Sequence, residues 1–401
     1  MIDYLKRKSL YLHLIILLFV SLPFAACSTG LSQSSVQGKT TSSASSMPLI
    51  SRGVPAYASS GSASDANDSS LDSLWRSNDV PAWIAYDLSS VPVSERGRVL
   101  LVWYNETYNY DHTIDKDVAY NMSGSYTIDI NFAPGGTSSP PASGWQTVVT
   151  VVDNHYHSRQ HVFNMRGANW VRLNATVADG TTENYSASFN MDIYDANRAL
   201  DDDFIDFGDS ITAGTMGHST VNGVPSFGDL IHNQIPDRFP IEEDGGIGYL
   251  ASGVPVDPQY HYLQKWLSIF PGKYVGLSYG TNDSYGCPNG AANAVYNNYV
   301  LMVQTVLAAG KIPIVPHMIW SPRSDLQMCA VAINAKLDQL YKAYPKVIPG
   351  PDLYAVFRNH PEDFGDGIHP NDQGTVLYRQ AWANMFLRTI YRWNGSSKTP
   401  A

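Results

Sequence analysis

The sequence predicts an all-β region followed by an α/β domain with a parallel sheet. From about Pro48 to Asp195, short runs of alternating apolar and polar residues recur between turn residues, which is typical of an antiparallel β-sandwich. After Arg198, buried strand-like runs alternate with helical patterns, which predicts a doubly wound α/β domain. The chain has 401 residues, enough for each region to form its own core. We therefore expect a β-sandwich over residues 48–197 and an α/β domain over residues 198–395.

The expected elements follow from these patterns. In the first region the expected strands are Ile84–Leu88, Val99–Trp103, Tyr126–Phe132, Thr147–Val152, His161–Met165, Trp170–Ala175 and Ser188–Tyr194. In the second region the expected buried strands are Phe204–Phe207, Tyr274–Ser278 and Ile312–Val315. The expected helices are Phe227–Ile235, Ala291–Ala309, Leu326–Tyr344 and Gln373–Tyr391. We expect the three aspartates at positions 201–203 to be a solvated lead-in to the first parallel strand.

The N-terminus carries the pattern of an export signal. Basic residues at positions 6–8 precede an apolar run that ends at Phe24 and is too short to span a membrane. Two alanines and then Cys27 follow, an ending that resembles a bacterial lipobox. The resemblance implies a signal peptide over residues 1–26 and a lipid anchor on Cys27, with ordinary cleavage before Cys27 as the alternative. Residues 27–47 are mostly Ser, Thr, Gly and Gln, so we expect a flexible tether and a protein that is held at the cell envelope or secreted.

The net charge limits the ligands that the protein can bind, and the cysteine content bears on whether it forms a disulfide. The formal net charge is −10, which leaves no basic excess to neutralise phosphates, so we expect no nucleic acid ligand. Contact with a membrane is expected only through the lipid anchor. Besides Cys27, the chain has only Cys287 and Cys329. In an exported protein this pair predicts one disulfide, and two buried free thiols are the alternative.

A serine follows the first predicted parallel strand directly. The strand runs into Gly208, Asp209 and Ser210, after which a helix is expected to begin. Ligands of open α/β sheets bind beyond the carboxyl ends of the strands, and a helix N-terminus directs backbone N–H groups at the ligand. Gly208 would permit a tight turn and a close approach of the substrate. The alternative is that this segment only caps a helix, because Ser and Asp are good N-cap residues.

Three further segments are expected at the same edge of the sheet. They are Asp244–Tyr249, a Gly-rich turn after a short strand, Tyr279–Asp283, directly after a central strand, and Asp366–Asn371, just before the last helix. A serine hydroxyl is a poor nucleophile until a neighbouring base takes its proton, and His369 suits that role. Asp366 lies three residues before His369 and can fix the orientation of its ring.

Together the four segments resemble the SGNH or GDSL hydrolase family, over about residues 203–392. The resemblance implies a flavodoxin-like three-layer fold and ester hydrolysis. Position by position, it implies that Ser210 is the nucleophile, that His369 is the general base and that Asp366 orients His369. This chemistry requires no cofactor and no metal ion, and we expect neither.

The same resemblance implies an oxyanion hole with three donors. They are the backbone N–H of Ser210, the side-chain amide of Asn282 and a backbone N–H of the Gly-rich turn. Gly248 is the first choice for the last donor and Gly246 is the second. This turn departs from the family pattern, because Asp244 stands where Asn is common and Tyr249 where a second Gly is frequent.

A rival nucleophile is Ser278, within a Gly-x-Ser-x-Gly match over residues 276–280. That motif requires a helix directly after the serine, whereas the residues that follow Ser278 are typical of a loop. We therefore interpret Ser278 as the end of a buried strand.

The β region, over about residues 50–195, resembles a discoidin-like, galactose-binding-like jelly roll. The landmarks are Leu74–Ser77, Pro81–Leu88, Val99–Trp103, Tyr126–Ile130, Gly144–Gln146 and Asn169–Leu173. The resemblance implies a sugar ligand bound by loops at one end. The polar aromatic stretch Tyr104–His112 is one candidate loop for stacking on sugar rings, and a tyrosine-rich surface loop without a ligand is the alternative. His155, His157 and His161 are interpreted as surface histidines in preference to a metal site.

These features combine into one hypothesis and two alternatives. The hypothesis is a serine esterase that acts on a small ester or an acetylated polysaccharide and removes O-acetyl groups outside the cell. The first alternative is a lipase, thioesterase or lysophospholipase of the same fold, which a broad apolar acyl groove would favour. The second is a carbohydrate-binding lipoprotein with an inactive hydrolase domain, against which the intact set of catalytic residues argues.

Overall fold

The computed structural model describes residues 45–68, 70, 73–105, 107–111, 113, 116–119, 121, 123–178, 186–216, 224–246 and 250–395. The signal peptide expected over residues 1–26, the anchor expected at Cys27 and most of the tether expected over residues 27–47 lie outside the described residues. Among the described residues, no helix combines the length and the apolar character needed to cross a membrane.

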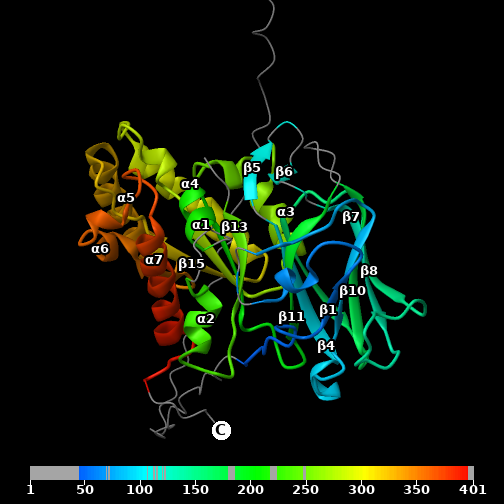
Figure 1. Ribbon diagram of the computed structural model, residues 1–401. Helices are drawn as coiled ribbons and strands as arrows, with labels where there is room; N and C mark the ends of the chain where they lie inside the picture. The colour runs from blue at the N-terminus through cyan, green and yellow to red at the C-terminus, as the bar shows by residue number, and fades with distance from the viewer. Residues whose placement is uncertain are drawn as a thin grey trace, which may run out of the picture. The chain divides into compact units, whose positions relative to one another are not determined.

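Two antiparallel sheets make up the N-terminal region. In the first sheet the strand order is β1-β3-β10-β7-β8, with bounds Ala56–Ala58, Ala82–Asp87, Trp170–Ala178, Ser123–Asn131 and Gln146–Val151. In the second sheet the order is β2-β11-β4-β9, with bounds Trp75–Arg76, Ser188–Asp195, Arg98–Tyr104 and Ser158–Asn164. The strands lie on the right in Figure 1. The β-rich N-terminal region is thus confirmed, whereas its jelly-roll topology stays a prediction.

A single apolar core joins these two sheets. Trp103 of β4 packs edge-on against Tyr126 of β7, with the ring centroids 5.4 Å apart. The Tyr86 hydroxyl of β3 donates to the Met191 carbonyl of β11 at 2.8 Å. Both contacts cross from one sheet to the other, and the alternating side chains of each strand supply the apolar face.

The second region is built on a parallel sheet with the strand order β13-β12-β14-β15-β16. The bounds, in the same order, are Ile241–Gly246, Asp203–Gly208, Tyr274–Ser278, Ile312–His317 and Ile348–Asp352. By order of appearance in the chain this is 2-1-3-4-5, the order of flavodoxin-like folds. Because all five strands are parallel, their carboxyl ends meet at one edge of the sheet.

Helices cover both faces of the parallel sheet. Ile205 and Phe207 face the core formed by α3 (Tyr262–Ile269), α4 (Ala291–Ala308) and α5 (Ser324–Ala343). Phe204 lies on the opposite face, in the core that contains side chains of α1 (Ser210–Thr215), α2 (Phe227–His232), α6 (Leu353–Phe357) and α7 (Asp372–Met385). Helices α2 and α7 lie side by side (Figure 1). The alternation of neighbouring residues between the two cores is the period of a strand that is buried on both faces.

Several elements of this region differ from the expected ones. β16 has the sequence Ile-Pro-Gly-Pro-Asp, which does not predict a strand. Proline is nevertheless tolerated in a strand at the edge of a sheet, where its lack of a backbone N–H costs no hydrogen bond to a neighbouring strand. The short helix α3 was not expected. Asp244–Gly246, expected as part of a turn, continue strand β13.

The aspartates between the two regions are buried, so the expectation of a solvated lead-in was wrong for Asp202 and Asp203. Both are fully buried. Asp203 accepts a hydrogen bond from the Gln160 side chain of β9 at 2.8 Å, and Asp202 is paired with Arg238. The Gln160–Asp203 bond holds the second β-sheet against the start of the parallel sheet, whereas the Asp202–Arg238 pair lies within the α/β region. Residues Ser43–Ala401 form one compact unit.

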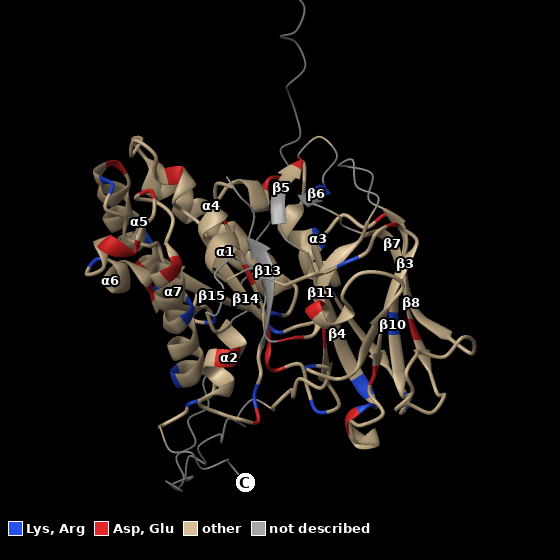
Figure 2. Ribbon diagram, viewed as in Figure 1, with Lys and Arg blue, Asp and Glu red and all other residues tan. Residues whose placement is uncertain are grey.

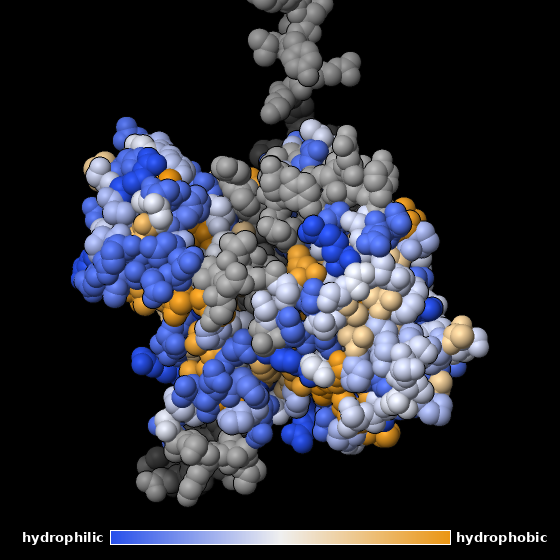
Figure 3. All heavy atoms as spheres, in the orientation of Figure 1, coloured by the Kyte–Doolittle hydropathy of each residue, from blue (hydrophilic) through white to orange (hydrophobic). Residues whose placement is uncertain are grey.

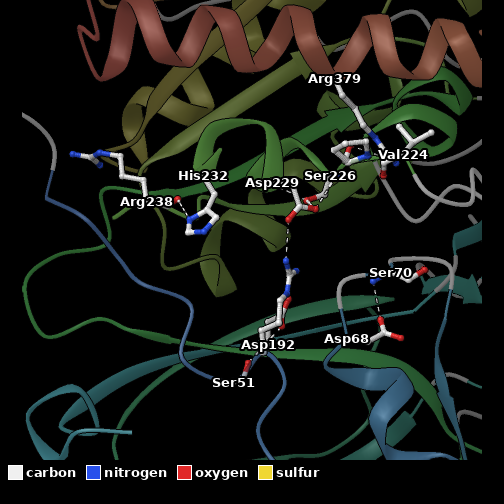
Figure 4. Close-up of polar contacts among 12 residues, drawn as sticks. Ser51, Asp68, Ser70, Asp192, Val224, Ser226, Asp229, His232, Arg238 and Arg379 are labelled. Atoms are coloured by element: carbon white, nitrogen blue, oxygen red, sulfur yellow. Dashed lines mark hydrogen bonds and ion pairs between the residues drawn. The ribbon is translucent and has the colours of Figure 1, made fainter. Parts of the chain in front are cut away.

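A second link joins the N-terminal segment to α2 through Asp229 (Figure 4). Its Oδ1 atom lies 2.9 Å from Nη1 of Arg52, and its Oδ2 atom accepts the N–H of Ser226 at 3.1 Å. The Ser226 hydroxyl accepts the N–H of Asp229 in return, which completes a capping box at the start of α2. One carboxylate therefore both caps a helix and anchors the β-rich region.

The face drawn in Figures 2 and 3 carries a mixed surface. Residues of both charges are interspersed along the ribbon in Figure 2. Hydrophilic side chains cover most of the same face in Figure 3, with apolar ones in separate groups.

The burial of Asp203 predicts how the stability of the protein changes with pH. Burial raises the pKa of this carboxyl to about 7, although the hydrogen bond from Gln160 acts in the opposite direction. In an unfolded chain the same group has a pKa near 4, so the wild-type protein loses stability as pH rises from about 4 to about 7. We expect Asp203→Asn to raise the free energy of unfolding at pH 8 by on the order of 2 kcal/mol, with little change at pH 4. Urea unfolding at the two pH values measures this.

Asp201 supplies the matched control. Burial acts to raise its pKa, but the Ser45 N–H and the Lys273 ammonium bind the carboxylate and hold the pKa below its usual value. Asp201→Asn should therefore lower stability at pH 8. A loss of stability at pH 8 in Asp203→Asn as well would contradict the prediction.

Candidate active site

Ser210 stands at the junction of strand β12 and helix α1. The N-cap of α1 is Asp209, whose Oδ1 atom accepts the N–H of Ile211 at 3.0 Å. Of the two residues that the sequence offers as the helix cap, Asp209 and Ser210, it is therefore Asp209 that caps α1. The Ser210 hydroxyl, on the first residue of the helix, does not serve as the cap.

Gly208 makes room for this junction. A Cβ atom at residue 208 would lie 1.9 Å from the Thr212 hydroxyl oxygen and 3.0 Å from the Ser278 carbonyl oxygen. Such contacts are far below van der Waals distance, so any side chain would force the strand and the helix apart.

A chain of hydrogen bonds connects Ser210 to the turn before α7. The Ser210 Oγ atom lies 2.8 Å from His369 Nε2, and His369 Nδ1 lies 2.7 Å from Asp366 Oδ2. Asp366 Oδ1 accepts the backbone N–H groups of Ile368 and His369 at 2.8 and 2.7 Å. Gly367 has φ +82° within this turn, a conformation that other residues rarely adopt. The turn thus holds the ring of His369 through Nδ1, and Ser210 contacts the ring through Nε2.

The carboxyl groups of Asp366 and Asp209, next to this chain of hydrogen bonds, have different pKa values. Burial acts to raise the pKa of Asp366, but hydrogen bonds from the His369 backbone and ring and from the Ile368 N–H outweigh it and lower the pKa to about 2. Burial raises the pKa of Asp209 to about 7, even though the Ile211 N–H and the charge of His369 act to lower it. Asp366 therefore stays ionised at neutral pH, whereas Asp209 titrates there.

Asn282 lies at the same edge of the sheet as Ser210. Strands β12 and β14 are neighbours, with Gly208 opposite Ser278, and Asn282 begins the 3-10 turn η4 (Asn282–Ser284) after β14. The Asn282 amide donates to the Leu250 carbonyl at 3.0 Å. A primary amide has two N–H donors, so one remains for a ligand.

The loop that carries Asn282 is held at several points. Asp283 accepts the N–H and the hydroxyl of Ser252 at 2.9 and 2.7 Å. A disulfide joins Cys287 to Cys329 of α5, with the Cα atoms 5.3 Å apart. The alternative of two free thiols does not apply to this structure.

The Gly-rich turn is described only in part. Gly248 and Tyr249 lie outside the described residues. Gly246 is the last residue of β13 and is paired with Gly208 of β12, so its backbone lies at the edge of the sheet that carries Ser210.

Ser278 lies at the end of β14, as expected, and its hydroxyl donates to Asp206 at 2.9 Å. The turn η4 follows, and the next α-helix described begins only at Ala291. The alternative nucleophile therefore lacks the helix that its motif requires.

Two features of the β region are more buried than the sequence suggests. Tyr104 ends strand β4, and β5 (Thr107–Asp111) pairs with β6 (Lys116–Ala119), so the expected loop is largely a hairpin. Tyr110 is 4% exposed, and its ring centroid lies 4.9 Å from that of Tyr262 on α3. Tyr104 and Tyr110 therefore pack within the protein, and sugar stacking by the rest of the stretch stays a prediction.

His157 and His161 are likewise buried and are not surface histidines. The Nδ1 atom of His157 lies 2.8 Å from Asp117 Oδ2, and Nε2 of His161 lies 2.7 Å from the Tyr126 hydroxyl. Burial lowers the pKa of His161 to about 3, so its ring is neutral.

Within the described part of the chain, one group has the residue types and spacing of a metal site. His360, Glu362 and Asp363 present ligand atoms within 4.8 Å of one another. The Nδ1 atom of His360 lies 3.5 Å from Glu362 and 3.6 Å from Asp363, an arrangement that a surface ion pair explains equally well.

A sequence model of the GDSL-like lipase/acylhydrolase family matches residues 207–377. This span is less than half of the chain and contains Ser210, Asn282, Asp366 and His369. No curated protein matches the sequence significantly.

Solved structures match one or both regions at low identity. A lipase/acylhydrolase from Enterococcus faecalis is 18% identical, over 46% of this chain and 94% of that chain, with a TM-score of 0.38. Protein YXIM from Bacillus subtilis is 14% identical, over 83% of this chain and 88% of that chain, with a TM-score of 0.40. A chitosan-binding module of a Paenibacillus sp. chitosanase/glucanase is 24% identical, over 37% of this chain and 98% of that chain, with a TM-score of 0.26. At these values the likenesses do not assign a substrate.

The disulfide generates a prediction about stability. Replacing both cysteines, Cys287→Ser with Cys329→Ser, opens a loop between residues that are 42 positions apart. In the chain-entropy account such a crosslink stabilises a protein by about 4 kcal/mol, so we expect a loss of up to that size and a lower Tm. Thermal unfolding of the double variant, of the wild type and of the wild type with dithiothreitol measures this. A double variant as stable as the oxidised wild type would exclude a stabilising bridge.

Proposed function

We propose that this protein, a carboxylic ester hydrolase with a GDSL-like lipase/acylhydrolase domain at residues 207–377, uses Ser210 as its nucleophile. His369 is the general base and Asp366 orients its ring. The observation that supports this assignment best is the continuous hydrogen-bond chain from the Ser210 hydroxyl through both ring nitrogens of His369 to the Asp366 carboxylate.

In the first half of the reaction, Ser210 Oγ attacks the carbonyl carbon of the ester while its proton passes to His369 Nε2. The ionised Asp366 stabilises the resulting imidazolium through its bond to Nδ1. The tetrahedral intermediate then collapses, and His369 returns the proton to the departing alcohol oxygen. Water repeats the same steps on the acyl-enzyme and releases the carboxylic acid.

Three donors stabilise the oxyanion of the tetrahedral intermediate in this proposal. The backbone N–H of Ser210 lies at the start of α1, where helix N–H groups have no partner in the helix. The free N–H of the Asn282 amide is the second donor. A backbone N–H of the Gly-rich turn, from Gly248 or Gly246, is the third. Loss of one such donor costs about 3 to 4 kcal/mol of transition-state stabilisation.

We propose that the substrate is an acetyl ester on an extracellular polysaccharide. The side chains of His369 and Asp366 are 44% and 55% exposed, which suits an ester on a bulky polymer. The export pattern before Cys27 places the enzyme, in this proposal, at the cell envelope, where such polymers lie.

Substitution of the proposed catalytic residues tests the mechanism. Ser210→Ala should abolish hydrolysis of p-nitrophenyl acetate, and Asp366→Asn should lower kcat by roughly 10³- to 10⁴-fold, because the ring of His369 loses its orientation. Ser278→Ala is the matched control and should keep most of the activity. Full activity in Ser210→Ala would exclude Ser210 as the nucleophile.

A comparison of acyl lengths and alcohols tests the substrate. We expect a higher kcat/KM for acetyl than for octanoyl p-nitrophenyl esters, together with release of acetate from acetylated xylan. A preference for octanoate without release of acetate from any acetylated polysaccharide would instead favour a lipase.

A further inference from the structure

One exposed aromatic side chain lies in the loop that follows Asn282. Tyr285 is the residue directly after the turn η4 and is 43% exposed. In the described part of the chain, Phe132 and Tyr285 are the two large aromatic side chains exposed to solvent, and only Tyr285 belongs to the α/β region. Cys287, two residues later, is tied to α5 by the disulfide. The ring is therefore displayed on an anchored segment.

Arg323 lies over this ring. Its guanidinium carbon is 5.4 Å from the ring centroid of Tyr285. Its Nε and Nη2 atoms bind the two carboxylate oxygens of Asp325 at 3.1 and 2.7 Å. A two-point bond of this kind fixes the plane of the guanidinium group and leaves further N–H donors for a ligand.

The Tyr285–Arg323 pair adjoins the turn that carries His369. A Cβ atom at Gly367 would lie 3.3 Å from Arg323 Cγ, so the stem of Arg323 lies against the turn between Asp366 and His369. Ser321 strengthens this contact, because its hydroxyl donates to the Gly367 carbonyl at 2.6 Å and accepts the Arg323 N–H at 3.1 Å. A group bound to the pair would therefore lie next to the proposed catalytic base.

We propose that Tyr285 and Arg323 form a subsite for the alcohol side of the substrate, which binds the pyranose ring that bears the ester. This inference rests on the proposed esterase function and names the class of its alcohol. A pyranose ring offers an apolar C–H face to the ring of Tyr285 and hydroxyl groups to the N–H donors of Arg323.

The charges around the pair favour a sugar over a hydrocarbon chain. Arg323 lies over the ring of Tyr285 and is paired with Asp325, so charged groups adjoin the ring. An acyl chain laid on this surface would remove water from these groups without offering hydrogen bonds in return. Sugar hydroxyls replace that water with hydrogen bonds. Because the disulfide already fixes the loop, binding needs little further ordering of the chain.

A comparison of two ester substrates distinguishes an effect on the sugar subsite from an effect on the catalytic centre. Ethyl acetate has an alcohol too small to reach Tyr285, whereas glucose pentaacetate presents an acetylated pyranose. With the full chain we expect Tyr285→Ala to lower kcat/KM for glucose pentaacetate about tenfold, mainly through KM, and to leave kcat/KM for ethyl acetate within about twofold. Tyr285→Phe keeps the ring and should stay within about threefold of the wild type on both esters. Release of acetate is followed by pH-stat titration.

Each other outcome overturns the subsite. Equal losses on both esters would show that Tyr285 only supports the fold, and Tm values of the variants would register the same change. A loss confined to ethyl octanoate, included as a third ester, would assign the ring to the acyl side. No loss on glucose pentaacetate would exclude stacking. Failure of the proposed function is distinguishable, because Ser210→Ala would then keep the wild-type rate on ethyl acetate.

Discussion

The hydrogen bond between Ser210 and His369 joins side chains that are 159 residues apart in the chain. Only the parallel register of the sheet makes that contact available. Gly208 of β12 is paired with Gly246 of β13 on one side and with Ser278 of β14 on the other. The segments after these strands must therefore emerge at one edge, where the turn before α7 also lies. The site depends on this register, because a slip by one residue would turn every side chain of a strand to the other face.

The β-rich region is attached to that sheet by buried charge. Asp203 begins β12 and binds Gln160 of β9, while Asp202 is paired with Arg238 of the α/β region and accepts the Met47 N–H of the N-terminal segment at 3.1 Å. Burial raises the pKa of Asp202 to about 6 and that of Asp203 to about 7. A carboxyl group that binds a proton more tightly in the folded protein lowers the stability at neutral pH. These residues therefore make the junction between the two regions specific but reduce the free energy of unfolding.

Much of the site could be predicted from the sequence, because four short motifs follow strands that their apolar runs identify. The exceptions have physical causes. Strand β16 contains two prolines and a glycine, so nothing in its composition indicates a strand. Asp203 and Tyr110 are polar enough to predict exposure, and their burial depends on partners such as Gln160 and Tyr262, which only the tertiary structure brings near. Asp209 as the helix cap, in place of Ser210, likewise follows from backbone angles that the motif does not encode.

The two carboxyl groups beside Ser210 show how environment divides roles between residues of one type. Asp366 is half exposed and holds its charge through hydrogen bonds from the turn, so its pKa is lowered to about 2. Asp209 is buried, and its pKa is raised to about 7. At neutral pH only Asp366 is therefore fully ionised and able to stabilise an imidazolium on His369. Asp209 contributes through geometry instead, since its bond to the Ile211 N–H starts α1 and presents Ser210 at the end of the helix.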